Sequence, residues 1–318
     1  MRVAAGPVLV LVLAVLASPA RAQAVAELTD RCGDASGGAI WCAAGATAYQ
    51  AAASGIGLAG SAGSDIPGTS STLGWRRGLG PRMALSARFT GTRIPLPDLA
   101  EALAINLPEL RSTVTKASLE GAVGLFDGFR WALRYGGFLS LDLVASVGVI
   151  GLAEADGFGD NAYSAGIGAR LGLLRESFDV PGVSVSAVRR FFGDVLLGAG
   201  DSPISVRFEP AATSVRALIG KEFRAAGIVA GVGWDRYSGT VTIEGPESGR
   251  RPRGVTLDGP ALDRLLLFAG ISRTWQVILV AGEIGWAAGF DGLPDLSVQP
   301  FDPGAGSVFG SLSLRITR

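Results

Sequence analysis

The chain of 318 residues contains no histidine, and this absence excludes several kinds of active site. Ser-His and Cys-His nucleophilic catalysis and His-ligated metal centres all need an imidazole. Charged residues make up 18% of the chain, below the roughly 25% that is typical of soluble domains. The 28 Lys and Arg residues balance the 28 Asp and Glu residues. The composition therefore gives no indication of nucleic-acid binding.

Long apolar runs are missing after the first 22 residues, although 48% of the chain is hydrophobic. Those first 22 residues have the pattern of a secretory signal peptide: a basic Arg2, an apolar stretch over 8–16, and small residues that end at Ala22. The alternative is a membrane anchor, but the apolar stretch is shorter than the ~20 residues that span a bilayer. We expect cleavage after Ala22, which leaves 318 − 22 = 296 residues.

Only two cysteines are present, Cys32 and Cys42. In an exported protein such a pair most simply forms a disulfide, and two free thiols are the alternative. A zinc site would need further Cys or His ligands, so we expect neither a metal nor a cofactor. The surrounding segment, 23–81, contains an Ala-rich predicted helix over 42–58 and a Gly/Ser-rich stretch over 60–68. We expect it to form a periplasmic or pore-plugging segment.

From residue 82 onward, apolar side chains alternate with small or polar ones. For example, Leu141 and Leu143 alternate with Ser140 and Asp142. Period-two alternation predicts strands with one apolar face. Ten such segments are predicted, over 82–94, 112–125, 133–150, 161–175, 182–195, 203–223, 227–243, 261–274, 276–289 and 305–317. Most of them are long enough for a tilted transmembrane strand, which needs about 9–11 residues.

Short and long connections alternate between these strands. The short ones lie near residues 127, 179, 225 and 274, and the long ones cover 95–111, 151–160, 196–202, 244–260 and 290–304. The first long connection contains a second predicted helix, over 97–109, with Asp98 as its N-cap. Short turns at one rim and long loops at the other are typical of outer-membrane barrels, in which the turns are periplasmic. Aromatic residues near both strand ends fit two interfacial girdles.

The pattern predicts an all-β fold: a transmembrane barrel of ten antiparallel strands over 82–318, with twelve strands as the alternative count. The competing interpretation is a soluble sandwich or lipocalin-like barrel with an apolar interior. Soluble surfaces usually carry many Lys and Glu side chains, whereas this chain has only two lysines, Lys116 and Lys221. Small polar residues with isolated charges fit a narrow polar lumen better.

These features together resemble those of bacterial outer-membrane β-barrel proteins. The last residues, Gly310 to Arg318, look like the strand that the barrel-assembly machinery recognises, with Leu312, Leu314 and Ile316 on one face. Members of that class usually end in an aromatic residue, and this chain ends in Arg318. The resemblance implies an outer-membrane location, contact with membrane lipid and lipopolysaccharide, and assembly by that machinery.

A second resemblance concerns the segment before the first strand. Residues 55–82 are similar to the start of the long-chain fatty-acid transporter family, whose members carry a small-residue hatch with an Asn-Pro-Ala element. Here Pro67-Gly68 stands without the Asn, and ten strands are fewer than that family has.

If the polar faces point inward, seven basic and five acidic side chains meet in the lumen. They are Arg88, Lys116, Glu120, Asp142, Arg170, Arg190, Arg216, Glu222, Asp235, Arg264, Glu283 and Arg315. They could select a solute, or they could pair with one another, as Arg170 could with Asp142 on the next strand, and fill a narrow barrel.

We therefore expect a structural or surface role with a largely self-filled lumen. The alternatives are a channel or transporter for a small or hydrophobic solute, and an outer-membrane enzyme. We predict no catalytic residue, because omptin-type and phospholipase-type chemistry both need histidine. The sequence does not predict the oligomeric state.

Overall fold

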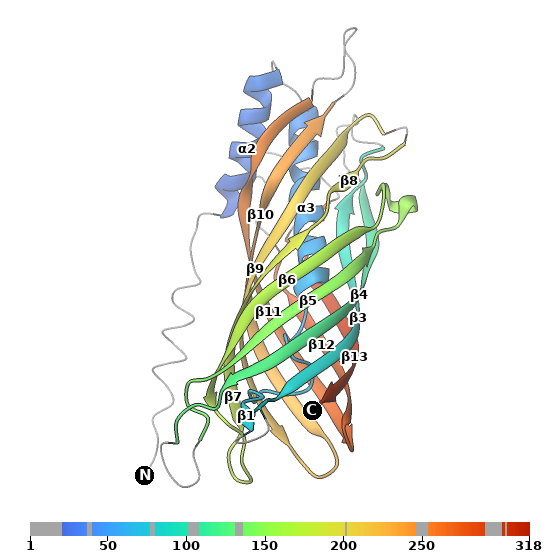
Figure 1. Cartoon of the computed structure of the whole chain (residues 1–318). Helices are drawn as coiled ribbons and strands as arrows, with labels where there is room; N and C mark the ends of the chain where they lie inside the picture. Colours follow the sequence, from blue (N-terminus) through green and yellow to red (C-terminus); the bar gives the residue numbers. More distant parts are fainter. Residues whose placement is uncertain are drawn as a thin grey trace.

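The computed structural model describes residues 21–36, 40–76, 80–100, 108–130, 136–200, 202–245, 254–289, 301–302 and 304–318. Its core is a closed antiparallel barrel of ten strands, as the alternation predicts (Figure 1). The strands follow one another around the wall in chain order, and β13 closes the ring by pairing with β3. Closure joins the two ends of the sheet into a ring, while the upper part of β11, Gly254 to Leu265, pairs only with β10 among the described strands.

The ten predicted strands correspond one by one to the strands of the wall. Their bounds are β3 Met83–Pro97, β4 Glu109–Phe126, β5 Ser140–Gly151, β6 Ala162–Leu174, β7 Gly182–Phe192, β9 Ser205–Glu222, β10 Gly227–Glu244, β11 Gly254–Trp275, β12 Ile278–Ala287 and β13 Ser307–Thr317. A short strand β8, Val195–Leu197, pairs with β9 beyond the end of β7, and β1 (Trp75–Arg76) pairs with β2 (Gly80–Pro81).

Two predicted strand boundaries differ from the structure by seven residues, and the others by three or fewer. Strand β5 begins at Ser140 instead of residue 133, so the turn predicted to be short near Asp127 extends to Leu139. Gly137 and Leu139 both have positive φ, which interrupts an extended strand. Strand β11 begins at Gly254 instead of residue 261, because β10 and β11 continue to pair beyond a bulge between Tyr237 and Gly239.

Side chains alternate in and out along every strand of the wall. The large exposed hydrophobic side chains face outward, and they form an apolar belt around the half of the barrel that contains the C-terminus; it includes Leu85, Phe89, Leu119, Leu143, Val147, Ile167, Ile219, Ile228, Ile271, Ile284, Leu312 and Leu314. Exposed arginines lie farther along the same strands, toward the long connections; they are Arg93, Arg111, Arg207 and Arg236. An apolar belt bounded by charges fits the hydrocarbon layer of a bilayer.

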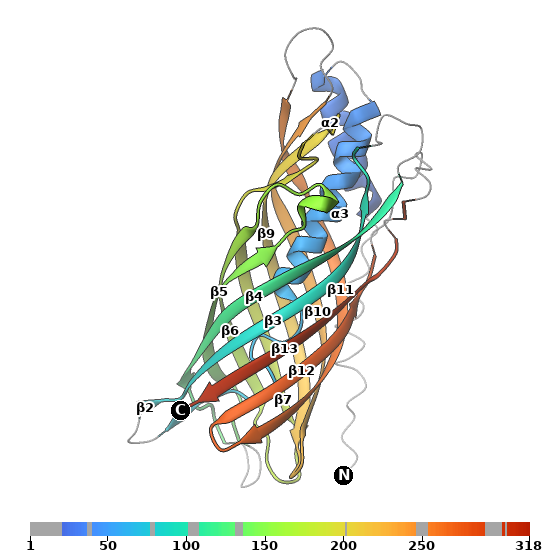
Figure 2. The same cartoon turned by 90° about the vertical axis from the view of Figure 1, so that its right-hand side faces the viewer.

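Two helices precede the barrel. Helix α2, Arg21–Ser36, packs against α3 and β11 at the end of the barrel that is farthest from the C-terminus. Helix α3, Ile40–Ser61, enters that end and runs down inside the ring of strands (Figures 1 and 2). The predicted disulfide is present: Cys32 and Cys42 join the two helices. No helix among the described residues is long and apolar enough to cross a membrane.

Other predictions fall largely outside the described residues. Of the signal peptide, 1–20 are not described, and α2 begins at Arg21, so cleavage after Ala22 stays a prediction. The predicted helix over 97–109 falls mainly on 101–107, which are not described. At its expected start, the backbone N–H of Ala100 donates to Asp98 Oδ1 at 2.9 Å.

Candidate functional site: a lumen occupied by the N-terminal segment

The interior of the barrel is occupied by the chain's own N-terminal segment. From Cys42 to Gly74 every residue is buried except Ala51, Thr69 and Ser71, which are partly buried. Helix α3 fills the upper half, and residues 62–74 continue downward without regular structure toward β1 (Figure 1). The predicted helix over 42–58 is part of α3, which lies within the barrel and enters it from the end opposite the C-terminus.

Small residues allow α3 to fit against the wall. A Cβ atom added to Gly57 would lie 2.3 Å from the ring of Tyr237, and one added to Gly45 would lie 2.4 Å from Ile243 Cγ2. Around the helix, inward-facing apolar side chains of the strands join its alanines in one buried cluster. The upper lumen is thus packed as a protein core.

The lower end of α3 is held by three basic side chains of the wall. Lys116 Nζ donates to the carbonyl oxygen of Gly60 at 2.8 Å, and Arg216 Nη2 donates to that of Ser61 at 2.7 Å. Arg88 Nη1 donates to the carbonyl oxygen of Ala62 at 3.1 Å. The last carbonyl groups of a helix have no partner within it, and its C-terminus attracts cations. All three side chains supply the missing donors, and the two arginines also supply the favourable charge.

Below the helix, wall side chains bind the main chain of the irregular segment residue by residue. Arg315 Nη1 donates to Pro67 O at 2.7 Å, and Arg170 Nη2 donates to Thr69 O at 2.7 Å. Ser64 N–H donates to Glu283 Oε2 at 3.1 Å, while Leu73 N–H and Gly74 N–H both donate to Asp142. Buried main-chain groups need such partners, because leaving them unpaired is costly.

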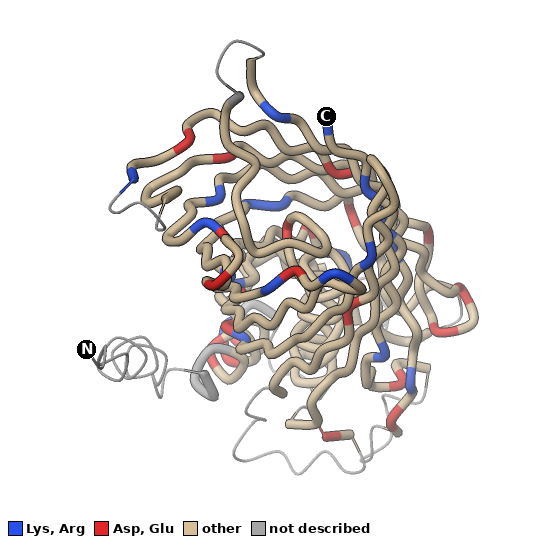
Figure 3. Tube along the Cα trace, turned by 90° about the horizontal axis from the view of Figure 1, so that it is seen from below, with Lys and Arg blue, Asp and Glu red and all other residues tan. Residues whose placement is uncertain are grey.

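Ion pairs complete the network. Arg216 Nη1 lies 2.6 Å from Asp235 Oδ1, and both side chains are fully buried. Arg88 Nη2 lies 3.3 Å from Glu120 Oε2. Arg190 Nη2 lies 2.5 Å from Asp65 Oδ1. Asp65 belongs to the threaded segment, so this last pair joins the wall to the plug (Figure 3 shows the acidic and basic positions from below).

Eleven of the twelve predicted lumen residues are buried inside the barrel. The twelfth, Glu222, is exposed at the turn between β9 and β10. Arg264 donates from Nε to Ala288 O at 2.6 Å. Asp142 and Arg170 are cross-strand neighbours, as predicted, but the hydrogen bonds described above direct both side chains to the threaded segment.

Sequence reasoning missed several polar residues of this network, among them Asp65, Ser61 and Tyr237. Asp65 binds Arg190, Ser61 Oγ donates to Asp235 Oδ2 at 2.6 Å, and Tyr237 donates to the same oxygen at 3.0 Å. Asp65 is the only charged residue between Gly60 and Gly74. That isolated charge in a stretch of small residues was the available signal.

At the lower end of the lumen, a carboxylate outside the strands holds the chain as it leaves the barrel. Asp127 Oδ1 accepts a hydrogen bond of 2.7 Å from Trp75 N–H and one of 3.0 Å from Arg175. Partial burial alone would raise the pKa of Asp127, but these two hydrogen bonds and the charge of Arg175 outweigh it and lower the pKa below its usual range. The carboxylate is therefore ionised at neutral pH and anchors Trp75.

In the described part of the chain, the charges of the lumen serve to bind the plug. Among the described residues, no group of three or more Cys, Asp and Glu could hold a metal ion. The wall charges already bind main-chain or side-chain groups of the chain itself. One small space beside α3, about 20 Å³, is lined by Ser54, Ile94 and Arg264 among others.

No protein-family model matches the sequence, and no curated protein is similar to it. Solved structures are similar in architecture. They include the translocator domain of the autotransporter NalP from Neisseria meningitidis (10% identity, TM-score 0.41, covering 75% of this chain and 88% of that one). Others are the toluene transporter TodX of Pseudomonas putida (9%, 0.31, 80% and 95%) and Ail, the attachment invasion locus protein of Yersinia pestis (8%, 0.29, 75% and 99%). The names of these proteins state different roles, and their likeness to this chain is one of barrel architecture alone.

Proposed function

We propose that the chain is an outer-membrane barrel with a structural or surface role, and that its own N-terminal segment seals it. In this proposal the apolar belt contacts lipid, the short turns and the C-terminus face the periplasm, and α2 lies outside the cell. The barrel then anchors α2 and the extended upper parts of β9, β10 and β11 at the surface.

The single observation that carries this proposal is the set of bonds between the wall and residues 60–74. Side chains from β3, β4, β5, β6, β9, β12 and β13 all bind the main chain of that one segment. A transport path would need the same space. Each bond that a solute displaced would leave a buried charge or a buried main-chain group without its partner, which is costly.

Conductance in planar lipid bilayers tests the seal. The full-length protein should show no steady conductance. Deletion of residues 23–74 should produce conducting openings, because it removes the helix and the irregular segment together and leaves the inward charges to solvent. A large steady conductance of the full-length protein would instead support the channel or transporter alternative.

A second variant keeps the complete chain, so that it tests the seal even if the deletion variant misfolds. Arg88→Ala combined with Arg216→Ala removes donors to Ser61, Ala62, Gly63 and Ser64. It should give brief openings while the barrel stays folded in gel-shift assays. Arg236→Ala, which changes an outward arginine of β10, is the matched control and should stay closed. If neither the deletion variant nor the double variant conducted ions, the segment would not be the seal.

A further inference from the structure

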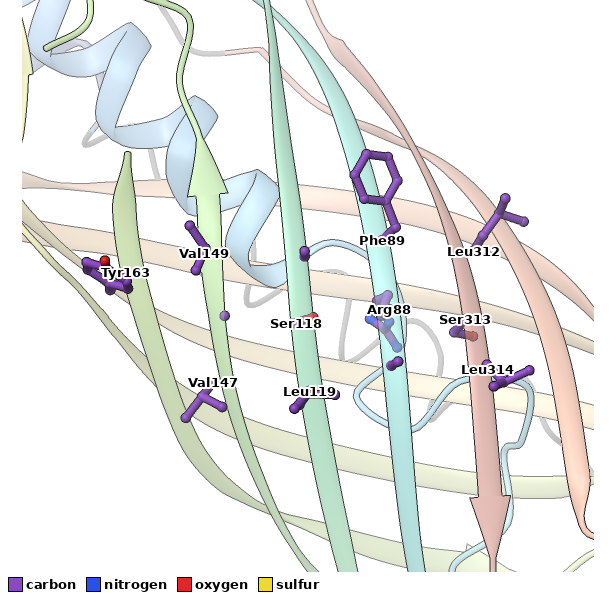
Figure 4. A pocket seen from close by; sticks show the side chains of 13 residues that line it. Arg88, Phe89, Ser118, Leu119, Val147, Val149, Tyr163, Leu312, Ser313 and Leu314 are labelled. Carbon is purple, nitrogen blue, oxygen red and sulfur yellow. The ribbon is translucent and has the colours of Figure 1, made fainter. Parts of the chain in front are cut away.

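The outer surface of the apolar belt carries two furrows separated by a ridge. The ridge consists of Phe89 and Leu312, which are register partners on β3 and β13 and are 54% and 67% exposed. On one side, a furrow of about 740 Å³ runs over Ala87 and Ala117 and is bounded by Tyr163 (Figure 4). On the other side, a furrow of about 730 Å³ includes outward glycines.

Two glycines in the second furrow have no packing reason to lack a side chain. Gly91 and Gly310 are register partners on β3 and β13. A Cβ added to Gly91 would meet nothing within 4 Å, and one added to Gly310 would meet only the main-chain oxygen of Glu283, at 3.8 Å. Glycine weakens a strand, and within a strand it often marks a place where a ligand approaches the backbone closely. The furrow is therefore shaped for something that lies against the wall.

A basic group lies at the end of the furrows nearest the long connections. Arg93 is the next outward residue after Gly91 on β3, and it is exposed. Its register partner on β13 is Val308, and Val308 pairs in turn with Trp286 on β12. Arg111 of β4, 68% exposed, pairs with Glu109 at 2.9 Å and lies one outward position farther along the wall. Apolar furrows beneath a basic rim match a lipid with an anionic head group.

We propose that this face binds a phosphorylated glycolipid of the outer leaflet, with acyl chains in the two furrows and a phosphate on Arg93. The assignment rests on the proposed function, since it needs the long connections to face the cell exterior. Arginine suits this role because its planar fork of donors matches the oxygens of a phosphate. Several acyl chains on one head group would straddle the ridge of Phe89 and Leu312.

A second copy of the barrel fits the same face less well. Two barrels in one membrane are related by an axis along the bilayer normal, so equivalent residues meet at the same depth. Arg93 of one copy would then approach Arg93 of the other, and like charges repel. An anionic lipid neutralises Arg93 instead.

Native mass spectrometry of the full-length protein in phosphatidylethanolamine nanodiscs, titrated with bis-phosphorylated lipid A, tests the proposal. Arg93→Ala should weaken lipid A binding about tenfold, as expected for loss of one charge-assisted hydrogen bond. Gly91→Leu places a side chain in the second furrow, where its Cβ meets nothing within 4 Å, and should also weaken binding. Each has a matched control: Arg236→Ala removes an outward arginine elsewhere, and Gly121→Leu fills an outward glycine that also meets nothing within 4 Å but lines neither furrow.

Each other outcome overturns the proposal in a distinct way. If Arg93→Ala and Arg236→Ala lowered the affinity for lipid A equally, the outward arginines would attract the lipid without a specific site at Arg93. If the protein bound phosphatidylglycerol as tightly as lipid A, the ligand would be any anionic lipid, and the assignment to a glycolipid would be wrong. Unchanged lipid binding by Gly91→Leu together with the loss of a cross-linkable dimer would identify a second copy as the occupant. The seal is measured separately by conductance, so a conducting protein with normal lipid A binding counts against the proposed function alone.

Discussion

Single residues of the wall contribute by binding the chain that they enclose. Arg216 illustrates this: it is fully buried, forms an ion pair with Asp235 and donates to the carbonyl oxygens of Ser61 and Gly63. Burying a charge costs several kcal/mol unless the charge is paired and hydrogen-bonded. Because Arg216 has both kinds of partner, its burial is tolerated, and its position fixes where α3 ends.

The outward face of the wall gives the residue-scale prediction. Leu143 is the fourth of the twelve residues of β5, lies inside the apolar belt, and is 42% exposed. Leu143→Arg should lower the free energy of unfolding in lipid vesicles, by at most the roughly 2–4 kcal/mol that an arginine costs on the lipid face at the midplane. Urea titration followed by tryptophan fluorescence measures this.

The control for that substitution lies beyond the belt. Thr256 on β11 is exposed, and its hydroxyl shares only an exposed hydrogen bond with Thr242. Thr256→Arg should therefore change the unfolding free energy little. A soluble barrel would tolerate both substitutions equally, so equal small effects would contradict a membrane-spanning belt.

At the scale of elements, the strands were predictable and the path of the N-terminal segment was not. Alternation predicts which side of the wall a residue faces, and it correctly separated Leu143 from Asp142. The composition of α3 predicts a helix, but small residues fit the inside of a barrel and a loose helix outside it equally well. Only the contacts of Gly57 with Tyr237 and of Lys116 with Gly60 reveal where α3 lies, and these join residues far apart in the sequence.

Helix α3 gives the prediction at this scale. Alanine favours a helix over glycine by about 1 kcal/mol, but a Cβ at Gly57 would overlap the ring of Tyr237, whose hydroxyl is bound to Asp235. Overpacking of this kind costs about 1–3 kcal/mol. Gly57→Ala should therefore lower the unfolding free energy or loosen α3, which limited proteolysis of the folded protein would detect.

Gly33 in α2 is the matched position, because a Cβ there would meet nothing within 4 Å. Gly33→Ala should leave the stability unchanged or raise it through helix propensity alone. If Gly57→Ala were stabilising to the same extent as Gly33→Ala, α3 would not be packed against the wall.

For the whole molecule, the path of the chain links the two ends of the barrel. The chain passes from α2 at one end, through the lumen, to β1 and β3 at the other, where the C-terminal strand also ends (Figure 1). If short turns are periplasmic, as in outer-membrane barrels, α2 must lie outside the cell. The experiment must therefore determine whether α2 and the short turns lie on opposite sides of the membrane.

Cysteine labelling on intact cells gives the whole-molecule prediction. In a background without Cys32 and Cys42, a membrane-impermeant maleimide should label Asp30→Cys on the exposed face of α2 and Thr256→Cys on upper β11. Ala225→Cys, in the turn between β9 and β10, should be labelled only after the outer membrane is permeabilised, because that turn would face the periplasm. Labelling of Ala225→Cys but not Thr256→Cys on intact cells would show that the barrel has the opposite orientation in the membrane. Labelling of Thr256→Cys but not Asp30→Cys would leave the barrel's orientation intact and show that α2 does not reach the surface.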